Sequence, residues 1–226
     1  MAFEERSYSS DLFRPRPEVV YNPDGQLLIV ATPWGPRSSA RKAVQFIQDF
    51  LASARHDEEA TSPFAKLSCL TPLGNQLRLA VKLTNDFIYQ EENKQEYLSG
   101  IELTIIARQK NEVAMVQIGH PYVVLDRPAT GLVVLSSQID LSSELSFENE
   151  MVSPLPGHLL GVDPTSDFQV QSLRHMPNDR LLLISRSSLP AAIYNLEYGR
   201  RGLQEISDLC AQSNDRMPFW VGALTF

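Results

Sequence analysis

A series of short apolar segments separated by tight turns, beginning at Gly100, constrains the fold of this 226-residue chain more than any other feature. The segments 101–108, 112–119 and 122–127 are joined by the turns QKN and HP, and a fourth segment, 131–137, follows the turn RPAT. Apolar segments of this length, bounded by such turns, are typical of strands joined as hairpins. Because a hairpin pairs its strands antiparallel, the sequence predicts an antiparallel sheet in the middle of the chain.

Two stretches that precede this block have helical periodicity instead. Apolar residues recur at steps of three and four in 40–54 and again in 77–88, while polar side chains take the other face. A buried strand that stops at Pro33 comes before the first helix. Two more strands, a helix and a final strand are predicted at 168–176, 180–185, 200–212 and 219–226. This order predicts an α+β fold in a single domain, 1–226, with 138–165 as a long surface excursion.

Charge and cysteine content narrow the class of partners. Lys and Arg total 20 against 27 Asp and Glu, which gives a net charge of −7 and argues against nucleic acid or an anionic membrane as a partner. The longest apolar runs, Leu27–Ala31 and Leu181–Ile184, are too short to cross a bilayer, and the N-terminal residues do not have the pattern of a signal peptide. Cys69 and Cys210 are expected to be small core side chains. The sequence thus predicts a cytoplasmic protein.

The common catalytic signatures do not occur in the sequence. It has no phosphate-binding loop, no GxGxxG, no CxxC pair and no HExxH, and its four histidines lack the spacing of metal ligands. No GxSxG elbow supports a Ser–His–Asp triad either. The function has to be inferred from weaker motifs and their order.

Six short stretches carry that order: RSYSSDLF, LLIVATPWGPRSSARKAV, VQIGHPYVVLDR, HLLGVD, DRLLLISRSS and RMPFWVGALTF. Together they resemble the type-2C (PPM-type), metal-dependent serine/threonine phosphatases. In that family the matching stretches hold an Arg followed by two acids, an Asp-Gly before a glycine-rich turn and a helix, a Gly-Asp-Ser-Arg hairpin, an Ala-Leu-Gly segment, a strand ending in Ser-Asp-Gly, and an Asp-Asn pair before the last strand. The resemblance implies the family fold, a four-layer α+β sandwich in which two antiparallel sheets lie face to face and a helix pair flanks each.

The resemblance also implies a reaction in which carboxylates hold two magnesium or manganese ions. Most positions that match those ligands carry other residues here: Ser10 for the first acid of the early pair, Thr32 and Pro33 for the Asp-Gly, Arg186 for the Asp of Ser-Asp-Gly, and Met217 and Pro218, or residues next to them, for the Asp-Asn. Only Arg6, the phosphate-contacting Arg of the motif, and Asp11 match. We therefore expect no catalytic residue, no metal site and no cofactor.

Arg186 is the replacement with the largest electrostatic consequence. A guanidinium in place of a carboxylate changes the local charge by two units, which opposes the binding of two divalent cations. We expect Arg186 to occupy the vacated metal site and to pair with Asp11, so that Asp11→Ala would cost about 3 kcal/mol. The alternative is that Arg186 points to solvent.

These observations predict a pseudophosphatase, a catalytically inactive protein that binds a protein partner through the degenerate cleft or the excursion 138–165. The sequence predicts neither the identity of that partner nor the oligomeric state.

Two alternatives stay open. One is a metal-independent reader of phosphorylated side chains, with Arg6, Arg37 and Arg186 as candidate phosphate or anion contacts. The other is an active metal-dependent phosphatase with displaced ligands, drawn from Asp11, Asp140 and Asp163.

Overall fold

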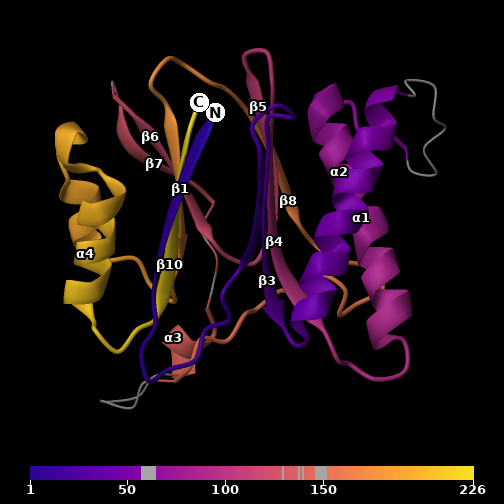
Figure 1. Ribbon diagram of the computed structural model, residues 1–226, viewed down its shortest axis with the longest axis horizontal. Coiled ribbons are helices and arrows are strands. Elements are labelled where there is room, and N and C mark those ends of the chain that lie inside the picture. Colours follow the sequence, from indigo (N-terminus) through magenta and orange to yellow (C-terminus); the bar gives the residue numbers. More distant parts are fainter. Residues whose placement is uncertain (57–64, 129, 137, 139, 146–151) are drawn as a thin grey trace. The chain divides into compact units, whose positions relative to one another are not determined.

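The computed structural model describes residues 1–56, 65–128, 130–136, 138, 140–145 and 152–226 (Figure 1). The chain divides into two compact units. Unit 1 consists of residues 1–16, 120–157 and 175–226, and unit 2 consists of residues 17–119 and 158–174. Each unit is therefore built from separate pieces of the sequence. The predicted single domain of residues 1–226 stays a prediction.

Unit 2 is built on a five-stranded antiparallel sheet with the order β2-β3-β4-β5-β8. The strands are β2 (Glu18–Asn22), β3 (Leu27–Trp34), β4 (Gly100–Gln109), β5 (Glu112–Ile118) and β8 (Gln169–Arg174). Two helices, α1 (Arg37–His56) and α2 (Pro72–Ile88), lie side by side on one face of this sheet (Figure 1). A short π-helical turn, η1 (Tyr89–Asn93), continues α2.

The helices of unit 2 form where the sequence periodicity predicts them. The inward stripe of α1, from Ala40 to Leu51, is buried against the sheet together with the matching stripe of α2. Helix α2 also has a strong start signal, because Pro72 stands in its first turn and the Thr71 side chain accepts a hydrogen bond from the Gly74 amide at 3.0 Å. Amphipathic faces packed on a sheet explain why α1 lies close to the predicted 40–54 and why α2 ends as predicted at Ile88, whereas α2 begins five residues before the predicted 77.

Unit 1 is built on a second five-stranded antiparallel sheet, with the order β1-β10-β9-β6-β7. The strands are β1 (Ala2–Tyr8), β6 (Tyr122–Arg127), β7 (Gly131–Ser136), β9 (Arg180–Ser185) and β10 (Phe219–Thr225). Helix α4 (Leu203–Ser213) contacts β1 and β10, and the 3₁₀ segment η2 (Ala191–Asn195) contacts α4. A single helical turn, α3 (Ser142–Leu145), and a second 3₁₀ segment, η3 (Tyr198–Arg200), complete the unit.

Two Asp-Arg dipeptides on neighbouring strands of unit 1 pair reciprocally. Asp126 of β6 lies opposite Arg180 of β9 and accepts a hydrogen bond from its Nε at 3.1 Å, while Arg127 donates from Nε to Asp179 at 3.0 Å. Arg201 adds a third guanidinium, whose Nη1 lies 2.8 Å from the second oxygen of Asp126. Both aspartates are fully buried, so these pairs satisfy charges that would otherwise be costly in the interior.

The main predictions on secondary structure are confirmed. All the strands predicted after Gly100 occur, the sheets are antiparallel, and the last helix runs over 203–213, close to the predicted 200–212. Strand β2 was not predicted. The expectation for Cys69 is wrong, because this side chain is exposed whereas Cys210 is buried.

The apolar runs of the sequence were predicted to be too short to cross a bilayer. Within the ranges that the structure describes, none of the helices combines the length and the apolar character needed to span a membrane.

Candidate functional site

One end of the unit 1 sheet brings together most of the positions that the family motifs single out. Strands β1 and β9 end there and β10 begins there, because Tyr8 pairs with Phe219 and Ser185 pairs with Trp220. The residues that directly follow or precede these strand ends are Ser10, Asp11, Arg186, Met217 and Pro218. The order of motifs in the sequence therefore gathers these residues at a common sheet end.

Arg186 is turned inward and binds the C-terminal end of α4. It is only 2% exposed. Its Nη2 donates to the carbonyl of Cys210 at 3.2 Å and to the Ser213 hydroxyl at 2.9 Å, and its Nη1 donates to the carbonyl of Ser188 at 2.6 Å. The last four carbonyls of a helix have no intrahelical donor and carry partial negative charge, so a cation is favourable at this place. Burial lowers the pKa of Arg186, because desolvation disfavours the charged guanidinium.

The expected pair between Arg186 and Asp11 is wrong. Asp11 binds Arg216 instead, with Nε and Nη2 at 3.2 and 3.0 Å from its Oδ2. Both side chains of this pair are more than half exposed. The alternative that Arg186 points to solvent is wrong as well, since its guanidinium donates hydrogen bonds to the carbonyls of Ser188 and Cys210.

Ser10 and Arg6 differ in their surroundings. The Ser10 hydroxyl donates to the carbonyl of Arg216 at 2.5 Å, which ties the end of β1 to the turn before β10. Arg6 lies within β1, opposite Val221 of β10, and is exposed. The phosphate-contacting Arg of the motif is thus accessible in unit 1, while Arg186 is not.

The remaining motif positions lie in unit 2, where β3 ends and α1 begins. Thr32 is buried, and its hydroxyl has no hydrogen-bond partner among the described residues. Pro33 is also buried, and Arg37, in the first turn of α1, lies 3.7 Å from the Glu18 carboxylate. Thr32, with a hydroxyl, thus stands where the family motif has the Asp, and Pro33 stands where it has the Gly.

Glu102 is a carboxylate at this end of the unit 2 sheet that the motif analysis missed. It is fully buried on β4, directly opposite Thr32 in the register, and accepts a hydrogen bond from the Trp34 indole at 3.0 Å. The signal in the sequence was an acidic residue within the otherwise apolar segment 101–108. Gly119 leaves room for it, because a Cβ at Gly119, where φ is +68°, would lie 2.5 Å from Glu102 Cγ.

The residues at the motif positions do not fit a pair of hard divalent cations. Such ions need several anionic oxygen ligands with free lone pairs. In unit 1 the matching carboxylate, Asp11, is neutralised by Arg216, and a guanidinium stands at Arg186. In unit 2 the matching residues, Thr32 and Pro33, bring no negative charge. Throughout the part of the chain that the structure describes, no group of three or more His, Cys, Asp or Glu side chains could hold a metal ion.

The two other aspartates considered as displaced ligands have different environments. Asp140 is buried in unit 1, where Arg14 Nη2 lies 3.2 Å from Oδ2 and the amides of Ser142 and Leu155 donate to Oδ1. Burial alone would raise the pKa of Asp140, but hydrogen bonds from the Ser187 side chain and these amides outweigh it and lower the pKa. Asp163, in unit 2, is exposed.

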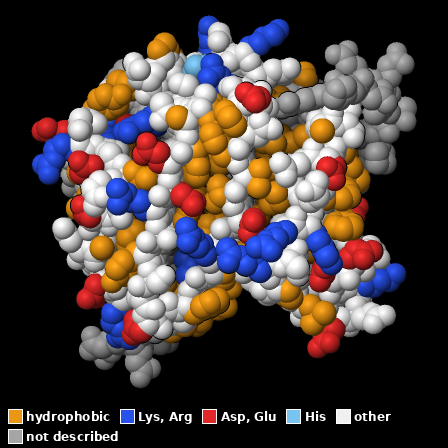
Figure 2. Space-filling view, in the orientation of Figure 1, with side chains coloured by type: hydrophobic (Ala, Val, Ile, Leu, Met, Phe, Trp, Pro, Cys, Tyr) orange, Lys and Arg blue, Asp and Glu red, His pale blue; other side chains and the backbone are white. Residues whose placement is uncertain are grey.

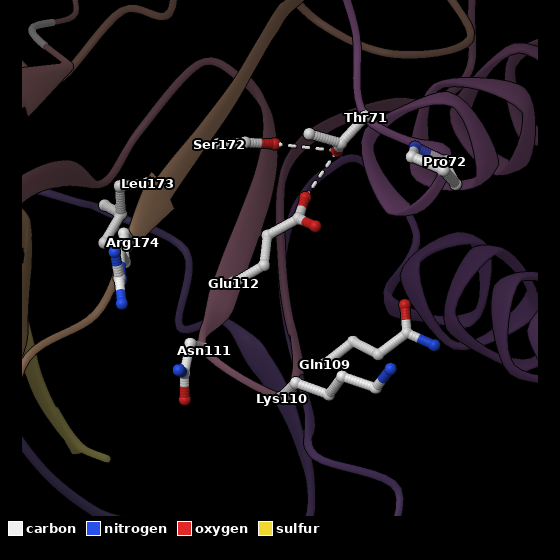
Figure 3. A pocket seen from close by; sticks show the side chains of 9 residues that line it. All are labelled: Thr71, Pro72, Gln109, Lys110, Asn111, Glu112, Ser172, Leu173 and Arg174. Atoms are coloured by element: carbon white, nitrogen blue, oxygen red, sulfur yellow. Dashed lines mark hydrogen bonds between the residues drawn. The ribbon is translucent and has the colours of Figure 1, made fainter.

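A surface hollow in unit 2 lies at the opposite end of the sheet from Thr32 and Pro33. It is lined by the β4–β5 turn, β8 and the start of α2: Thr71, Pro72, Gln109, Lys110, Asn111, Glu112, Ser172, Leu173 and Arg174 (Figure 3). Glu112 and Ser172 point toward the Thr71 hydroxyl and are hydrogen-bonded to it (Figure 3). The carboxylate of Glu112 thus lies beside the start of α2. None of the residues that line the hollow is a motif position.

Figure 2 shows both Lys and Arg side chains and Asp and Glu side chains on the visible surface.

No protein-family model and no curated protein matches the chain. Solved structures match it over its full length. The PPM Ser-Thr phosphatase MsPP from Mycobacterium smegmatis, solved with cacodylate, has a TM-score of 0.67 and 16% identity over 99% of this chain and 97% of its own. The Mycobacterium tuberculosis serine/threonine phosphatase PstP/Ppp has a TM-score of 0.63 and 18% identity over 100% and 98%. A PstP catalytic domain solved with two manganese ions has a TM-score of 0.60 and 20% identity over 99% and 97%.

These likenesses show that the chain has the fold of PPM-type serine/threonine phosphatases. They confirm the fold class predicted from the sequence, an α+β fold with two antiparallel sheets. At these identities the comparison concerns the fold alone.

Proposed function

We propose that the chain is a catalytically inactive relative of the PPM-type phosphatases, a pseudophosphatase that acts by binding another protein. The observation that carries the proposal is the burial and hydrogen bonding of the Arg186 guanidinium. The family motif implies a metal-binding Asp at this position, and here a buried guanidinium donates three hydrogen bonds to Ser188, Cys210 and Ser213. A cation fixed in this way repels a divalent ion and supplies no ligand oxygen.

The replacements at Ser10, Thr32 and Pro33 support the same proposal. Ser10 and Thr32 stand where the motifs have acids, and both lack the carboxylate that metal binding requires, while Pro33 stands where the motif has a Gly. A protein that functions by binding has the same packing constraints as an enzyme of this fold, but it has no need of metal ligands.

The experiment is a phosphatase assay on the purified chain with 4-nitrophenyl phosphate and with a phosphoserine peptide, each with and without millimolar Mn²⁺ or Mg²⁺. We expect no metal-dependent turnover. The matched control is Asp11→Ala, which removes the matching acid while leaving the fold intact, because Asp11 is exposed. Turnover that requires Mn²⁺ and disappears in Asp11→Ala would overturn the proposal in favour of an active phosphatase.

The proposal does not include phosphate reading by Arg6, Arg37 and Arg186 together. Arg186 is 2% exposed and its guanidinium is occupied by Ser188, Cys210 and Ser213. A thermal-shift titration with phosphoserine and phosphothreonine peptides separates the two functions, and we expect no rise in melting temperature. A saturable rise that is lost in Arg6→Ala would favour the reader.

A further inference from the structure

Strand β7 forms one edge of the unit 1 sheet. It pairs with β6 on one side, and none of the strands that the structure describes pairs with its other side (Figure 1). Alternate residues of an antiparallel strand direct their N–H and C=O groups to opposite sides, so about half of the backbone groups of β7 lie at this open side. The structure that can match such a row of groups is the backbone of another extended segment. We refer to the open side of β7 as the β7 edge.

The sequence of β7 does not protect this edge. Each of the other edge strands, β1, β2 and β8, carries at least one charged residue, whereas β7 reads GLVVLS. Charged side chains on an edge strand discourage pairing with another chain. Of the edges of the two sheets, the β7 edge is therefore the one most suited to receive an added strand.

The side chains at the centre of β7 are apolar and accessible. Val133 and Val134 are 41% and 40% exposed. Because successive side chains of a strand point to opposite faces, each face of β7 has an exposed valine. An added strand would form an apolar cross-strand pair with each of them. These pairs favour a segment of uncharged, β-branched residues.

A buried guanidinium lies at the Gly131 end of β7. Arg201 is 9% exposed, and its Nε donates to the Leu196 carbonyl and its Nη1 to Asp126, both at 2.8 Å. Its Nη2 makes no hydrogen bond among the described residues, and a Cβ at Gly131 would lie 3.7 Å from this atom. Asp126 also binds Arg180, so one carboxylate serves two guanidiniums. A carboxylate placed beside Gly131 would therefore find a donor and a favourable charge.

This guanidinium favours a partner segment over a second copy of the chain. Two copies paired through β7 would bring no carboxylate to Arg201, because the strand GLVVLS has none. Each copy also has a net charge of −7, which opposes their association. Glu197 and Glu205 are the nearest acids in the sequence, and in the described part of the chain neither forms an ion pair with Arg201. The place beside Gly131 thus suits a carboxylate of a partner.

We infer that the β7 edge binds an extended apolar segment of a protein partner, added antiparallel to β7, with an acidic residue at the C-terminal end of the segment. In this orientation the C-terminal end lies beside Gly131, where its acid reaches Arg201. All strand pairs of the unit 1 sheet are antiparallel, which is the more stable pairing per residue.

This inference rests on the proposed function, which it deepens by naming the binding surface and the conformation of the bound segment. The two fail separately, since the phosphatase assay reads catalysis and the following experiment reads binding alone.

The probe is a fluorescein-labelled peptide of about eight residues, in which Val and Thr alternate up to a final Asp with an amidated C-terminus. Fluorescence anisotropy is measured as the full chain is titrated into it, and we expect saturable binding. The same peptide with N-methylated amides retains its side chains but loses its backbone donors, so it should not bind. A peptide with Asn in place of Asp should bind about five-fold more weakly, because it loses a charge-assisted hydrogen bond.

Variants of the chain test the same contact from the other side. The double variant Val133→Lys/Val134→Lys should weaken binding about ten-fold, because it removes an apolar pair on each face and puts charge on the edge strand. Val152→Lys is the matched control, since Val152 is 39% exposed in unit 1 and lies outside β7, and it should bind within about two-fold of the unmodified chain. In Arg201→Gln the Asp and Asn peptides should bind alike.

Two measurements guard against misfolded variants. Circular dichroism melting checks that each variant is folded. Hydrogen exchange of the unmodified chain needs no variant at all: the Asp peptide should slow exchange in β7 and leave β1 and β8 unchanged, because the added strand protects the amides at the β7 edge. If Arg201→Gln does not fold, the difference between the Asp and Asn peptides on the unmodified chain decides whether the acid contributes.

Five results would overturn the inference. They are no saturable binding, binding of the N-methylated peptide, equal binding of the Asp and Asn peptides, undiminished binding to the double variant, and slowed exchange at another edge strand in place of β7. A dimer in sedimentation that the double variant dissociates would likewise overturn it, and would assign the β7 edge to a second copy of the chain.

Discussion

Replacement of Arg186 by Met tests the central feature of the candidate site. Methionine retains most of the length of the side chain and removes the guanidinium. The Ser188 and Cys210 carbonyls then each lose a charged donor, while the Ser213 hydroxyl still donates to the Cys210 carbonyl, at 3.0 Å. The expected result is a less stable chain, because the buried Cys210 carbonyl loses a hydrogen bond that the rest of the fold cannot replace, whereas Ser188 is exposed.

Two opposing effects set the size of this loss. Each hydrogen bond from a charged donor contributes about 1.5–3 kcal/mol. Against this, burying the cation costs several kcal/mol, and burial accordingly lowers the pKa of Arg186. We expect a net destabilisation of about 2 kcal/mol, or about 4–8 °C in melting temperature for a chain of this size. Arg186→Lys retains the charge but has a single nitrogen, so it should be no more stable than Arg186→Met.

Urea unfolding followed by circular dichroism measures these free energies, and Asp11→Ala supplies the comparison. The Asp11–Arg216 pair is exposed, so Asp11→Ala should cost less than about 0.5 kcal/mol. Its effect should also add to that of Arg186→Met, since the two residues have different partners. A cost near 3 kcal/mol for Asp11→Ala that vanishes in the Arg186→Met background would refute this reasoning, because it would mean that Asp11 and Arg186 pair in solution.

Two further expectations concern titratable groups. The pKa of Asp140 is lower in the folded chain than in the unfolded chain. Its contribution to the free energy of unfolding is therefore present above about pH 4 and is lost as the pH falls through the folded pKa. In urea unfolding between pH 5 and 3, the stability of Asp140→Asn should fall less steeply than that of the unmodified chain. An equally steep loss in that variant would contradict the assignment. Burial raises the pKa of Cys210 to about 11, which leaves about one thiol in a thousand ionised at pH 8, so a disulfide reagent should modify only Cys69 in the native chain and both cysteines after unfolding. Two fast-reacting thiols in the native chain would contradict the burial of Cys210.

The antiparallel core was predictable because each strand and helix carries its own signal in the sequence. Apolar segments bounded by tight turns predicted β4, β5 and β6, and periodicity predicted α1 and α2. Strand β2 was not predicted because it is a partly exposed edge strand of five residues within a polar, proline-rich stretch. Strand β3 runs one residue past Pro33, where it was predicted to stop. The pairing with β2 ends at Ala31, so the missing amide of Pro33 breaks no bond to β2.

The sequence predicted which residues lie near the candidate site, but it did not predict where the Arg186 guanidinium points. The motif order predicted that Arg186 and Asp11 lie close together, and the register of β1, β9 and β10 places the residues that follow β1 and β9 at one end of the sheet. Arginine has a long, flexible side chain, so its position on a strand leaves open where its guanidinium lies. The partners that decide this, the carbonyl of Cys210 and the hydroxyl of Ser213, belong to a helix more than twenty residues further along the chain. Such a contact depends on tertiary packing and has no local signal.

The residues that the chain shares with the motifs, and those it lacks, divide according to what the fold itself demands. Gly119 and Gly161 both have positive φ, and a Cβ would lie 2.5 Å from Glu102 at the first and 2.4 Å from Ile88 at the second. Gly161 also donates its amide to Asn85, at 2.8 Å. A side chain at either glycine would force backbone or core atoms apart, whatever the protein does. No such packing constraint requires a carboxylate at a sheet end, because a guanidinium there can donate to the Cys210 carbonyl and the Ser213 hydroxyl of α4. Packing thus requires the glycines whatever the activity, and the proposed binding function requires no carboxylates at the other motif positions.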